Sequence, residues 1–260
     1  MLGLVDYHMH SILSDGKQTY EEMIKKAIEI GLEEVGFSDH VCLKTVEWAV
    51  SPIDIPVMTE QILELREKFQ DQITVRYGIE MDYFPGKEKE IQEIISQLPL
   101  DYVIGSVHFI GDWNFDTDKS LYGKWSNDEL YHMYYELIQQ AVKSGLFDTI
   151  GHLDIIKKFR VYPENDQSQL IEDTLKVIKQ NGLVVELNTG GLDRPCAELT
   201  PSPEIVEQCY FHHIPMTISS DAHSTAQLAR HYETALNLMK KIGFEEIVTF
   251  ENRTRKMTHI

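Results

Sequence analysis

Short apolar runs rich in β-branched residues recur along the chain, separated by longer stretches in which apolar and polar residues mix. Strands that are buried on both faces of a parallel sheet show this continuous hydrophobic pattern. The runs predict strands over residues 3–8, 34–40, 73–82, 102–108, 149–154, 183–188 and 216–221, with a weaker strand over 246–250.

The stretches between these runs carry helix start and stop signals. Residues 19–22 and 126–129 have the Ser/Thr-x-x-Glu spacing of a capping box. Beyond residue 129, apolar side chains recur at the spacing of one helix face. Ser202 before Pro203 is typical of a helix beginning, and two lysines followed by Gly243 are typical of a helix end.

Strand and helix patterns alternate about seven times in 260 residues, which predicts an α/β fold with a parallel sheet. The length suits a closed, TIM-like barrel with the helices outside, and we expect residues 1–260 to form a single domain. A doubly wound open sheet is the alternative. It usually has a glycine-rich first turn, which this sequence lacks. No Gly-Lys pair is followed by Ser or Thr as in a P-loop.

Charge is the unusual part of the composition. The chain has 24 Lys and Arg against 42 Asp and Glu, a formal net charge of −18. A surface this acidic repels nucleic acids and anionic lipids, so we expect no nucleic-acid partner and no membrane association. The same charge opposes a small phosphorylated substrate unless some feature reverses the field locally.

The remaining composition favours a protein of the reducing cytoplasm. Three widely spaced cysteines without a Cys-x-x-Cys pair suggest neither a thiolate zinc site nor a disulfide framework. The N-terminus has no basic start and no long apolar stretch, so we expect no signal peptide. No window reaches the roughly 18 apolar residues that a membrane span needs.

Metal-type ligands stand at the end of almost every predicted strand. In a barrel, the C-terminal ends of the strands meet at one mouth, where active sites form. A single histidine pair would carry little weight, but ligands at successive strand ends indicate a metal centre. The residues are His8, His10, Asp15, His40, Glu80, His108, His152, Asp221 and His223.

The spacing and chemistry of these residues indicate the kind of metal centre. Residues two apart in a strand share a face, so His8 and His10 point into the mouth together, as do Asp221 and His223. Mixed histidine and carboxylate ligands suit Zn, Mn or Fe. Nine ligands are too many for one ion. We therefore expect two to three divalent metal ions, with Glu80 as the central bridge.

The motifs around these ligands resemble the PHP (polymerase and histidinol phosphatase) superfamily along essentially the whole chain. They lie at residues 5–11, 15–16, 37–40, 78–80, 105–108, 151–154 and 220–223. Further stretches resemble the histidinol-phosphatase branch of that superfamily, at residues 186–192, 200–204 and 250–253.

This resemblance implies a distorted seven-stranded (β/α) barrel with a trinuclear metal site. The nine residues above fall on the nine ligand positions of the family without a departure. A hydroxide that bridges the metals, held by Glu80 and the other ligands, is the expected nucleophile. Three divalent cations also reverse the local field, which removes the objection to a phosphorylated substrate.

Cationic residues near the predicted mouth are candidates to bind the phosphate. Arg160 is the first candidate, because a guanidinium binds phosphate in a bidentate manner. It ends the basic stretch 157–160, which directly follows a predicted strand end. The further candidates are Lys158, Arg194 and Lys17.

Other polar and aromatic residues are candidates for supporting roles. Asp154 and Asp39 are candidates to hydrogen-bond metal ligands. Acidic loop residues that could pair with a substrate amine are Asp82, Asp112 and Asp116. Aromatic residues that could line a substrate pocket, although such side chains more often belong to the core, are Trp48, Trp113 and Trp125.

These features predict a metal-dependent phosphomonoesterase that hydrolyses histidinol phosphate in histidine biosynthesis. The alternative with the same chemistry is an enzyme for another small phosphoester, such as a nucleotide or phosphotyrosine. A metal-stabilised binding protein is less favoured, because structural metal sites rarely need so many ligands. Amidohydrolases usually carry a metal-bridging lysine, and no strand-end motif here ends in Lys. The sequence leaves open whether the protein forms a homo-oligomer.

Overall fold

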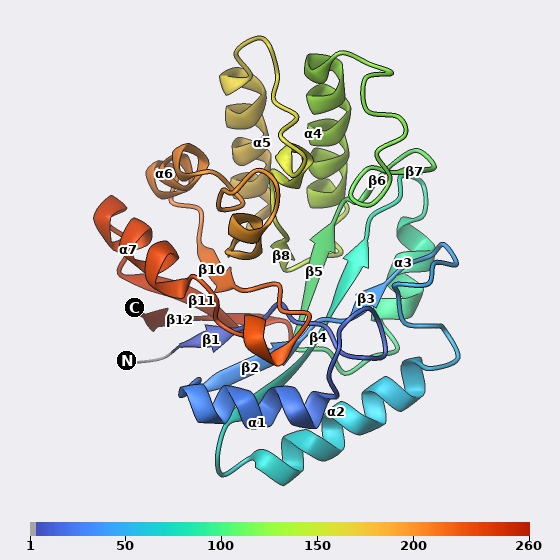
Figure 1. Ribbon diagram of the computed structural model, residues 1–260, viewed down its shortest axis with the longest axis vertical. Coiled ribbons are helices and arrows are strands. Elements are labelled where there is room, and N and C mark those ends of the chain that lie inside the picture. The colour runs from blue at the N-terminus through green and yellow to red at the C-terminus, as the bar shows by residue number, and fades with distance from the viewer. Residues whose placement is uncertain (1–3) are drawn as a thin grey trace.

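The computed structural model describes residues 4–260 and shows a ring of parallel strands surrounded by helices (Figure 1). Within these residues the main sheet runs β1-β2-β4-β5-β8-β9-β10, and neighbouring strands are parallel. A parallel bridge between Met9 and Ala222 nearly closes the ring, which confirms the predicted TIM-like barrel. The strands are β1 (Val5–Asp6), β2 (Glu34–Phe37), β4 (Thr74–Asp82), β5 (Tyr102–Ser106), β8 (Thr149–Ile150), β9 (Val184–Asn188) and β10 (Met216–Ser219).

Helices cover the outside of the ring (Figure 1). Both predicted capping boxes are complete, at Thr19 before α1 and at Ser126 before α4. Ser202 precedes the helix that begins at Pro203, but its side chain makes no capping hydrogen bond. The helices are α1 (Tyr20–Ile30), α2 (Ile55–Phe69), α3 (Glu88–Ile95), α4 (Asn127–Lys143), α5 (Ser168–Asn181), α6 (Pro203–Phe211) and α7 (Tyr232–Ile242). Short 3-10 turns are η1 (Ile155–Lys157), η2 (Gly190–Asp193) and η3 (Thr225–Gln227).

Several strands differ in extent from the prediction. The first predicted strand begins at residue 3, which lies outside the described residues. The predicted strand 34–40 is divided into β2 and β3 (His40–Val41), with the amide of Glu80 shared between the carbonyls of Ser38 and Asp39. The predicted strand 149–154 ends early as β8, because His152 has a φ of 24°, which an extended strand does not allow.

Two antiparallel pairs accompany the ring. The hairpin of β6 (Phe109–Ile110) and β7 (Trp113–Asn114) follows β5 and has no counterpart among the predicted strands. The weaker predicted strand is observed as β11 (Glu246–Glu251), and it pairs with the unpredicted β12 (Thr254–His259). No helix of the described chain is long and apolar enough to cross a membrane.

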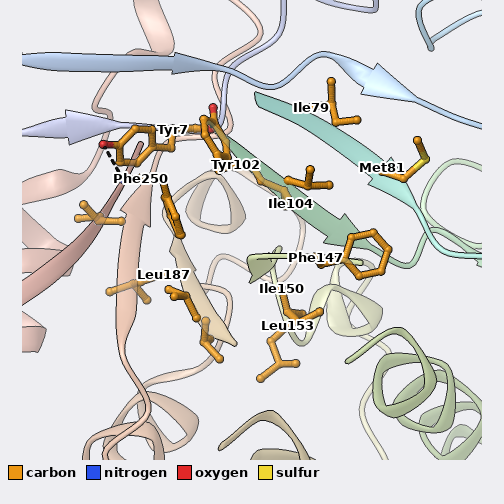
Figure 2. Packing of buried hydrophobic residues seen from close by; sticks show 14 of the residues in the cluster. Tyr7, Ile79, Met81, Tyr102, Ile104, Phe147, Ile150, Leu153, Leu187 and Phe250 are labelled. Carbon is orange, nitrogen blue, oxygen red and sulfur yellow. Dashed lines mark hydrogen bonds between the residues drawn. The ribbon is translucent and has the colours of Figure 1, made fainter. Parts of the chain in front are cut away.

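Tyr102 is the central side chain of an aromatic cluster in the core (Figure 2). A Cβ on Gly36 or Gly78 would lie within 2.4 Å of the Tyr102 side chain, so two glycines give this ring its space. The Tyr102 hydroxyl donates to the carbonyl of Tyr7 at 2.6 Å. The Tyr102 ring also stacks on Phe250, with 5.7 Å between the ring centroids. This end of the barrel, here called the floor, is therefore closely packed by side chains that are not among the predicted ligands.

The two-residue period of the strands places the polar mouth directly above this floor. Gly78, Glu80 and Asp82 share one face of β4, as Tyr102 and Ser106 share one face of β5. The Ser106 hydroxyl donates to Glu80 Oε1 at 2.6 Å. The face of β4 that contacts the Tyr102 ring at Gly78 therefore carries Glu80 two residues farther on, at the mouth.

Few backbone hydrogen bonds join β1 to β10 at the seam, where the ring of strands closes. The buried Asp6 carboxylate accepts a hydrogen bond from the Ser220 amide at 3.0 Å. The His10 amide donates to the Ala222 carbonyl at 2.8 Å, and the Ala222 amide donates to the His8 carbonyl at 3.0 Å. These contacts set the two histidines beside the segment that follows β10.

Candidate metal centre

The structure brings the nine predicted ligands together at the C-terminal mouth of the ring. Their donor atoms form four overlapping groups, and within each group all donor atoms lie within 4.8 Å of one another. The groups are His10 with Asp15, His40 and His223; His8 with Glu80 and His152; His8 with His10 and Asp221; and His40 with Glu80 and His108. The positions agree with the prediction, and the role of each residue as a ligand remains a prediction.

Glu80 lies at the centre of the mouth and is almost completely buried. Its Oε2 atom is 3.0 Å from His8 Nε2 and 2.9 Å from His40 Nδ1. Its Oε1 atom is 3.0 Å from His152 Nε2 and 3.6 Å from His108 Nε2. Because the two oxygens face different histidine pairs, this carboxylate is placed to bridge two cations.

A second group of donors lies around His10. The His10 ring is 4.3 Å from the rings of both His40 and His223, measured between centroids. Asp15 reaches this group from the loop after β1, and its Oδ2 atom is 3.3 Å from His223 Nε2. Four metal-type side chains therefore face one another across a short distance.

The chemistry of His10 fits a bound metal ion. Both of its ring nitrogens are buried and have no hydrogen-bond partner among the described residues. Burial, together with the charges of His223 and His40, lowers the pKa of His10 to about 4. The ring is therefore neutral near pH 7, which is the form that binds metals. A metal ion would supply the partner that this side chain lacks.

The carboxylates of the mouth stay ionised although they are buried. Burial acts to raise the pKa of Glu80, but the charges of His40 and His8 outweigh it and hold this pKa well below its usual range. For Asp221, burial likewise opposes ionisation, but the charges of His8 and His223 outweigh it and hold this pKa well below its usual range. Ionised carboxylates and a neutral His10 form a donor set suited to divalent ions. A centre of this kind confirms the predicted class of cofactor.

Two buried carboxylates contact the Nδ1 atoms of two predicted ligand histidines and so orient their rings. Glu186 Oε1 is 2.6 Å from His8 Nδ1, which leaves His8 Nε2 facing Glu80. Asp82 Oδ1 is 3.0 Å from His108 Nδ1. A carboxylate on the far ring nitrogen fixes the tautomer and the orientation of a metal-binding histidine. Glu186 is absent from the sequence-based candidates, although its place near the end of a predicted strand was a usable signal.

Two of the predicted ligands have left-handed backbone conformations, with φ of 24° at His152 and 52° at Asp221. Such residues cost about 1–3 kcal/mol each and persist where the surroundings hold them. Arg230 donates from Nε to the Ser220 carbonyl and from Nη2 to the Asp221 carbonyl, each at 3.0 Å. Glu186 Oε2 accepts from the His152 amide at 2.6 Å. Arg230 and Glu186 thus stabilise both turns.

The donors open into a cavity of about 330 Å³ that also contains positive charge. Lys17, Lys158 and Arg194 line it, as predicted for phosphate binding. Arg160 does not line it. Its backbone has a left-handed φ of 62°, and its Nε donates to the Pro195 carbonyl at 2.6 Å. The structure therefore favours Arg194 over Arg160 as the guanidinium at this mouth.

The residues expected to support the ligands have other contacts. Asp39 accepts from the Ser11 amide at 2.6 Å and from the Ser11 hydroxyl at 2.9 Å, which fixes the loop after His10. Asp154 is 2.8 Å from Lys157 Nζ, and neither carboxylate hydrogen-bonds a predicted ligand within the described residues. Asp39 therefore supports Asp15 indirectly, through the path of its loop.

The three candidate partners for a substrate amine also differ in position. Asp82 is engaged with His108, as described above. Asp112 is exposed and pairs with Lys44 at 2.9 Å, outside the cavity. Asp116 lines the cavity and accepts from Lys158 Nζ, with 2.7 Å to each carboxylate oxygen. Of these three residues, only Asp116 lines the cavity, and it has no hydrogen bond to a predicted ligand histidine.

The PHP domain family matches residues 6–190. This chain belongs to the PHP family. A probable histidinol-phosphatase of Deinococcus radiodurans is 33% identical in an alignment of 259 positions that covers 97% of this chain and 98% of that protein. The histidinol-phosphatase of Bacillus subtilis is 25% identical over 89% of this chain and 97% of its own length.

A PHP relative of known structure shares the fold along nearly the whole chain. It is the crystal structure of histidinol phosphate phosphatase from Lactococcus lactis, complexed with Zn, L-histidinol and phosphate. The match has a TM-score of 0.85 and 26% identity, and it covers 97% of this chain and 98% of that chain. The resemblance to the histidinol-phosphatase branch, seen first in short motifs, is confirmed over the full length.

Proposed function

We propose that this protein is a metal-dependent phosphomonoesterase that hydrolyses L-histidinol phosphate to L-histidinol and phosphate. The observation that carries the proposal is the convergence of nine metal-type donors, with Glu80 at their centre, in a cavity that also contains Lys17 and Arg194. The names of relatives that match almost end to end support the choice of substrate.

The nine donors, Glu80 among them, are proposed to hold two to three divalent ions. When bound, these ions supply Lewis acidity toward the phosphate oxygens and activate water for attack at phosphorus. His8 and His108 are held for this task by Glu186 and Asp82, whose carboxylates keep the far ring nitrogens occupied.

Arg194 is the proposed binding group for the phosphate. Its guanidinium makes no hydrogen bond or ion pair with the other described residues, although it lines the cavity. A free guanidinium can therefore present two parallel N–H donors to a phosphate. The charge of Lys158 is already balanced by Asp116, so we assign it a smaller share of the phosphate binding.

A substrate panel tests the proposed function. The purified protein, loaded with Zn²⁺ or Mn²⁺, is assayed for phosphate release from histidinol phosphate, phosphotyrosine, a nucleoside monophosphate and p-nitrophenyl phosphate. We expect kcat/KM to be highest for histidinol phosphate by at least about a hundredfold. Equal, slow release from all four would contradict the proposal. A clear preference for phosphotyrosine or the nucleotide would support the alternative small phosphoester.

The proposal extends to partners, domain organisation and location. A net charge of −18 argues against a nucleic-acid partner, and the cations Lys17 and Arg194 in the cavity support a small phosphorylated substrate. Donors from His8 to His223 meet in one mouth, which supports one catalytic domain over residues 1–260. Three buried free cysteines support a reducing compartment such as the cytoplasm, the expected site of amino-acid biosynthesis.

A further inference from the structure

The charges around the mouth are not evenly distributed. The main cavity is lined by Lys17 and Arg194, next to the predicted ligands. A narrow extension of about 80 Å³ continues past His40 and His108, and no lysine or arginine lines it among the described residues. Its other lining residues are Asp15, Trp48, Asn114, Asp116 and Thr117. A doubly charged phosphate is favoured in the main cavity, and a neutral or cationic group is favoured in the extension.

Trp48 forms an aromatic wall of this extension. Its ring lies at 78° to the His40 ring, with 4.8 Å between the centroids. On its other side it stacks on Phe109 of β6, with centroids 6.2 Å apart and an interplanar angle of 26°. Trp48 is half-buried, so part of its surface stays available to a bound molecule.

Contacts of Lys44 between two loops hold the Trp48 wall in place. Lys44, in the same loop as Trp48, donates from Nζ to the Gly111 carbonyl at 3.2 Å and to Asp112 Oδ1 at 2.9 Å. Its ammonium also lies 4.5 Å from the centroid of the Phe109 ring. These contacts join the Trp48 loop to the β6–β7 hairpin, so the aromatic wall is preorganised for binding.

The opposite lining of the extension is polar and acidic. Asn114 Oδ1 accepts from the amides of Asp116 and Thr117 at 3.0 and 3.1 Å, which fixes the turn after β7. Each Asp116 oxygen accepts one hydrogen bond from Lys158 and retains lone pairs for another donor. A molecule in the extension would have an aromatic ring on one side and a carboxylate on the other.

We propose that this extension binds the leaving alcohol of the substrate, with Trp48 packing against a planar nitrogen heterocycle. The inference rests on the proposed function, in which the alcohol carries an imidazole and an amine. A flat ring with N–H groups suits both an aromatic wall and an acidic lining. Trp48 would thereby determine which phosphomonoesters are hydrolysed well, while the metal centre performs the chemistry.

Steady-state kinetics on two substrates test the role of Trp48. The metal-loaded wild type and Trp48→Leu are compared on histidinol phosphate and on ethyl phosphate, which has no ring. We expect the ratio of the two kcat/KM values to fall roughly tenfold in Trp48→Leu, mainly through KM for histidinol phosphate. Trp48→Phe, which keeps an aromatic ring, should restore most of the ratio. Trp125→Leu is the matched control and should leave the ratio unchanged, because Trp125 packs on Trp113 away from the extension.

Tryptophan fluorescence provides a second measurement that needs no turnover. Histidinol added to the metal-loaded protein should quench part of the emission in wild type and in Trp125→Leu, but not in Trp48→Leu. Equal quenching in all three proteins, or an unchanged kinetic ratio in a folded Trp48→Leu, would overturn the inference alone. A wild type without any preference for histidinol phosphate would overturn the proposed function and this inference with it.

Discussion

At the scale of single residues, the site depends on carboxylates that face several histidines at once. Glu80 reaches five histidines through its two oxygens, and Glu186 holds both the His8 ring and the His152 amide. Because Glu80 and Glu186 each contact more than one histidine, no other residue type easily replaces either of them. Replacing either carboxylate should also displace the histidines that it contacts.

The role of Glu186 leads to a prediction about metal affinity. Glu186→Gln keeps the size of the side chain but removes the charge that orients His8, so the affinity for Zn²⁺ or Mn²⁺ should fall about 10–100-fold. Equilibrium dialysis with metal analysis measures this change. Glu172→Gln, an exposed substitution on α5, is the matched control. Unchanged affinity in Glu186→Gln would show that His8 needs no carboxylate behind it.

The ionisation of Glu80 leads to a prediction about acid stability. Because the folded state lowers the pKa of Glu80 below its usual 4.5, the stabilisation is present above about pH 4.5 and is lost as the pH falls through the folded-state pKa. The urea midpoint of the metal-free protein should therefore drop between pH 6 and pH 3. The drop should be smaller in Glu80→Gln. Identical drops in the two proteins would exclude Glu80 as a source of the acid sensitivity.

The residue types of the mouth could be predicted from the sequence, but the directions of several side chains could not. Strand ends must converge in a barrel, so His8, Glu80 and Asp221 could be grouped without coordinates. The position of Arg160 after a strand predicts a place at the mouth, whereas its side chain hydrogen-bonds the Pro195 carbonyl and does not line the cavity. This side-chain direction, which no periodicity reveals, distinguishes it from Arg194.

At the scale of elements, the ring strands were predictable because each lies in a short apolar run, and several are followed by a helix start signal. The hairpin strands β6 and β7 have two residues each, which is too short for any periodicity. β12 is mostly exposed and polar, so it lacks a hydrophobic pattern. The unpredicted elements are therefore those that are stabilised by neighbours rather than by their own sequence.

The loop between β1 and α1 leads to a prediction about the position of Asp15. A Cβ on Gly16 would lie 2.2 Å from the His10 carbonyl oxygen, so Gly16→Ala must displace the loop. Metal affinity should fall by roughly tenfold or more, the scale seen when the support of a ligand is lost. Dialysis with metal analysis again gives the readout.

Gly31→Ala separates this effect from a general loss of stability. Gly31 has a φ of 82° at the end of α1, and a Cβ added there would have no heavy atom within 4 Å. The substitution should lower the free energy of unfolding by about 1–2 kcal/mol and leave metal affinity unchanged. If Gly16→Ala behaved in the same way, the close approach to His10 would have no consequence for the site.

At the scale of the whole molecule, the packed floor and the metal-type mouth are separate regions of one barrel. The cluster of Tyr7, Tyr102 and Phe250 is buried without any of the nine donors. We therefore expect chelation by EDTA to leave the circular dichroism spectrum of the folded protein unchanged. The spectrum would instead collapse if the barrel depended on its metals.

Chelation should nevertheless lower the melting temperature. Metal held at a thousandfold excess over Kd stabilises the folded state by about 4 kcal/mol, which corresponds to on the order of 10 °C for a protein of this size. Calorimetry with and without EDTA measures the shift, and adding Zn²⁺ or Mn²⁺ back should reverse it. An identical melting temperature in both conditions would contradict tight binding at this mouth.

The seam between β1 and β10 has a consequence for the order of events during synthesis. Asp6 and Ser220 meet across 214 residues of sequence, and His8 and His10 lie against the segment that follows Ser220. A nascent chain that has emerged only through α6 already displays the first seven donors, but it has neither Asp221 nor His223. The last two donors of the centre thus leave the ribosome only after the chain up to α6. Uptake of a full complement of ions should therefore require that the segment after β10 has been synthesised.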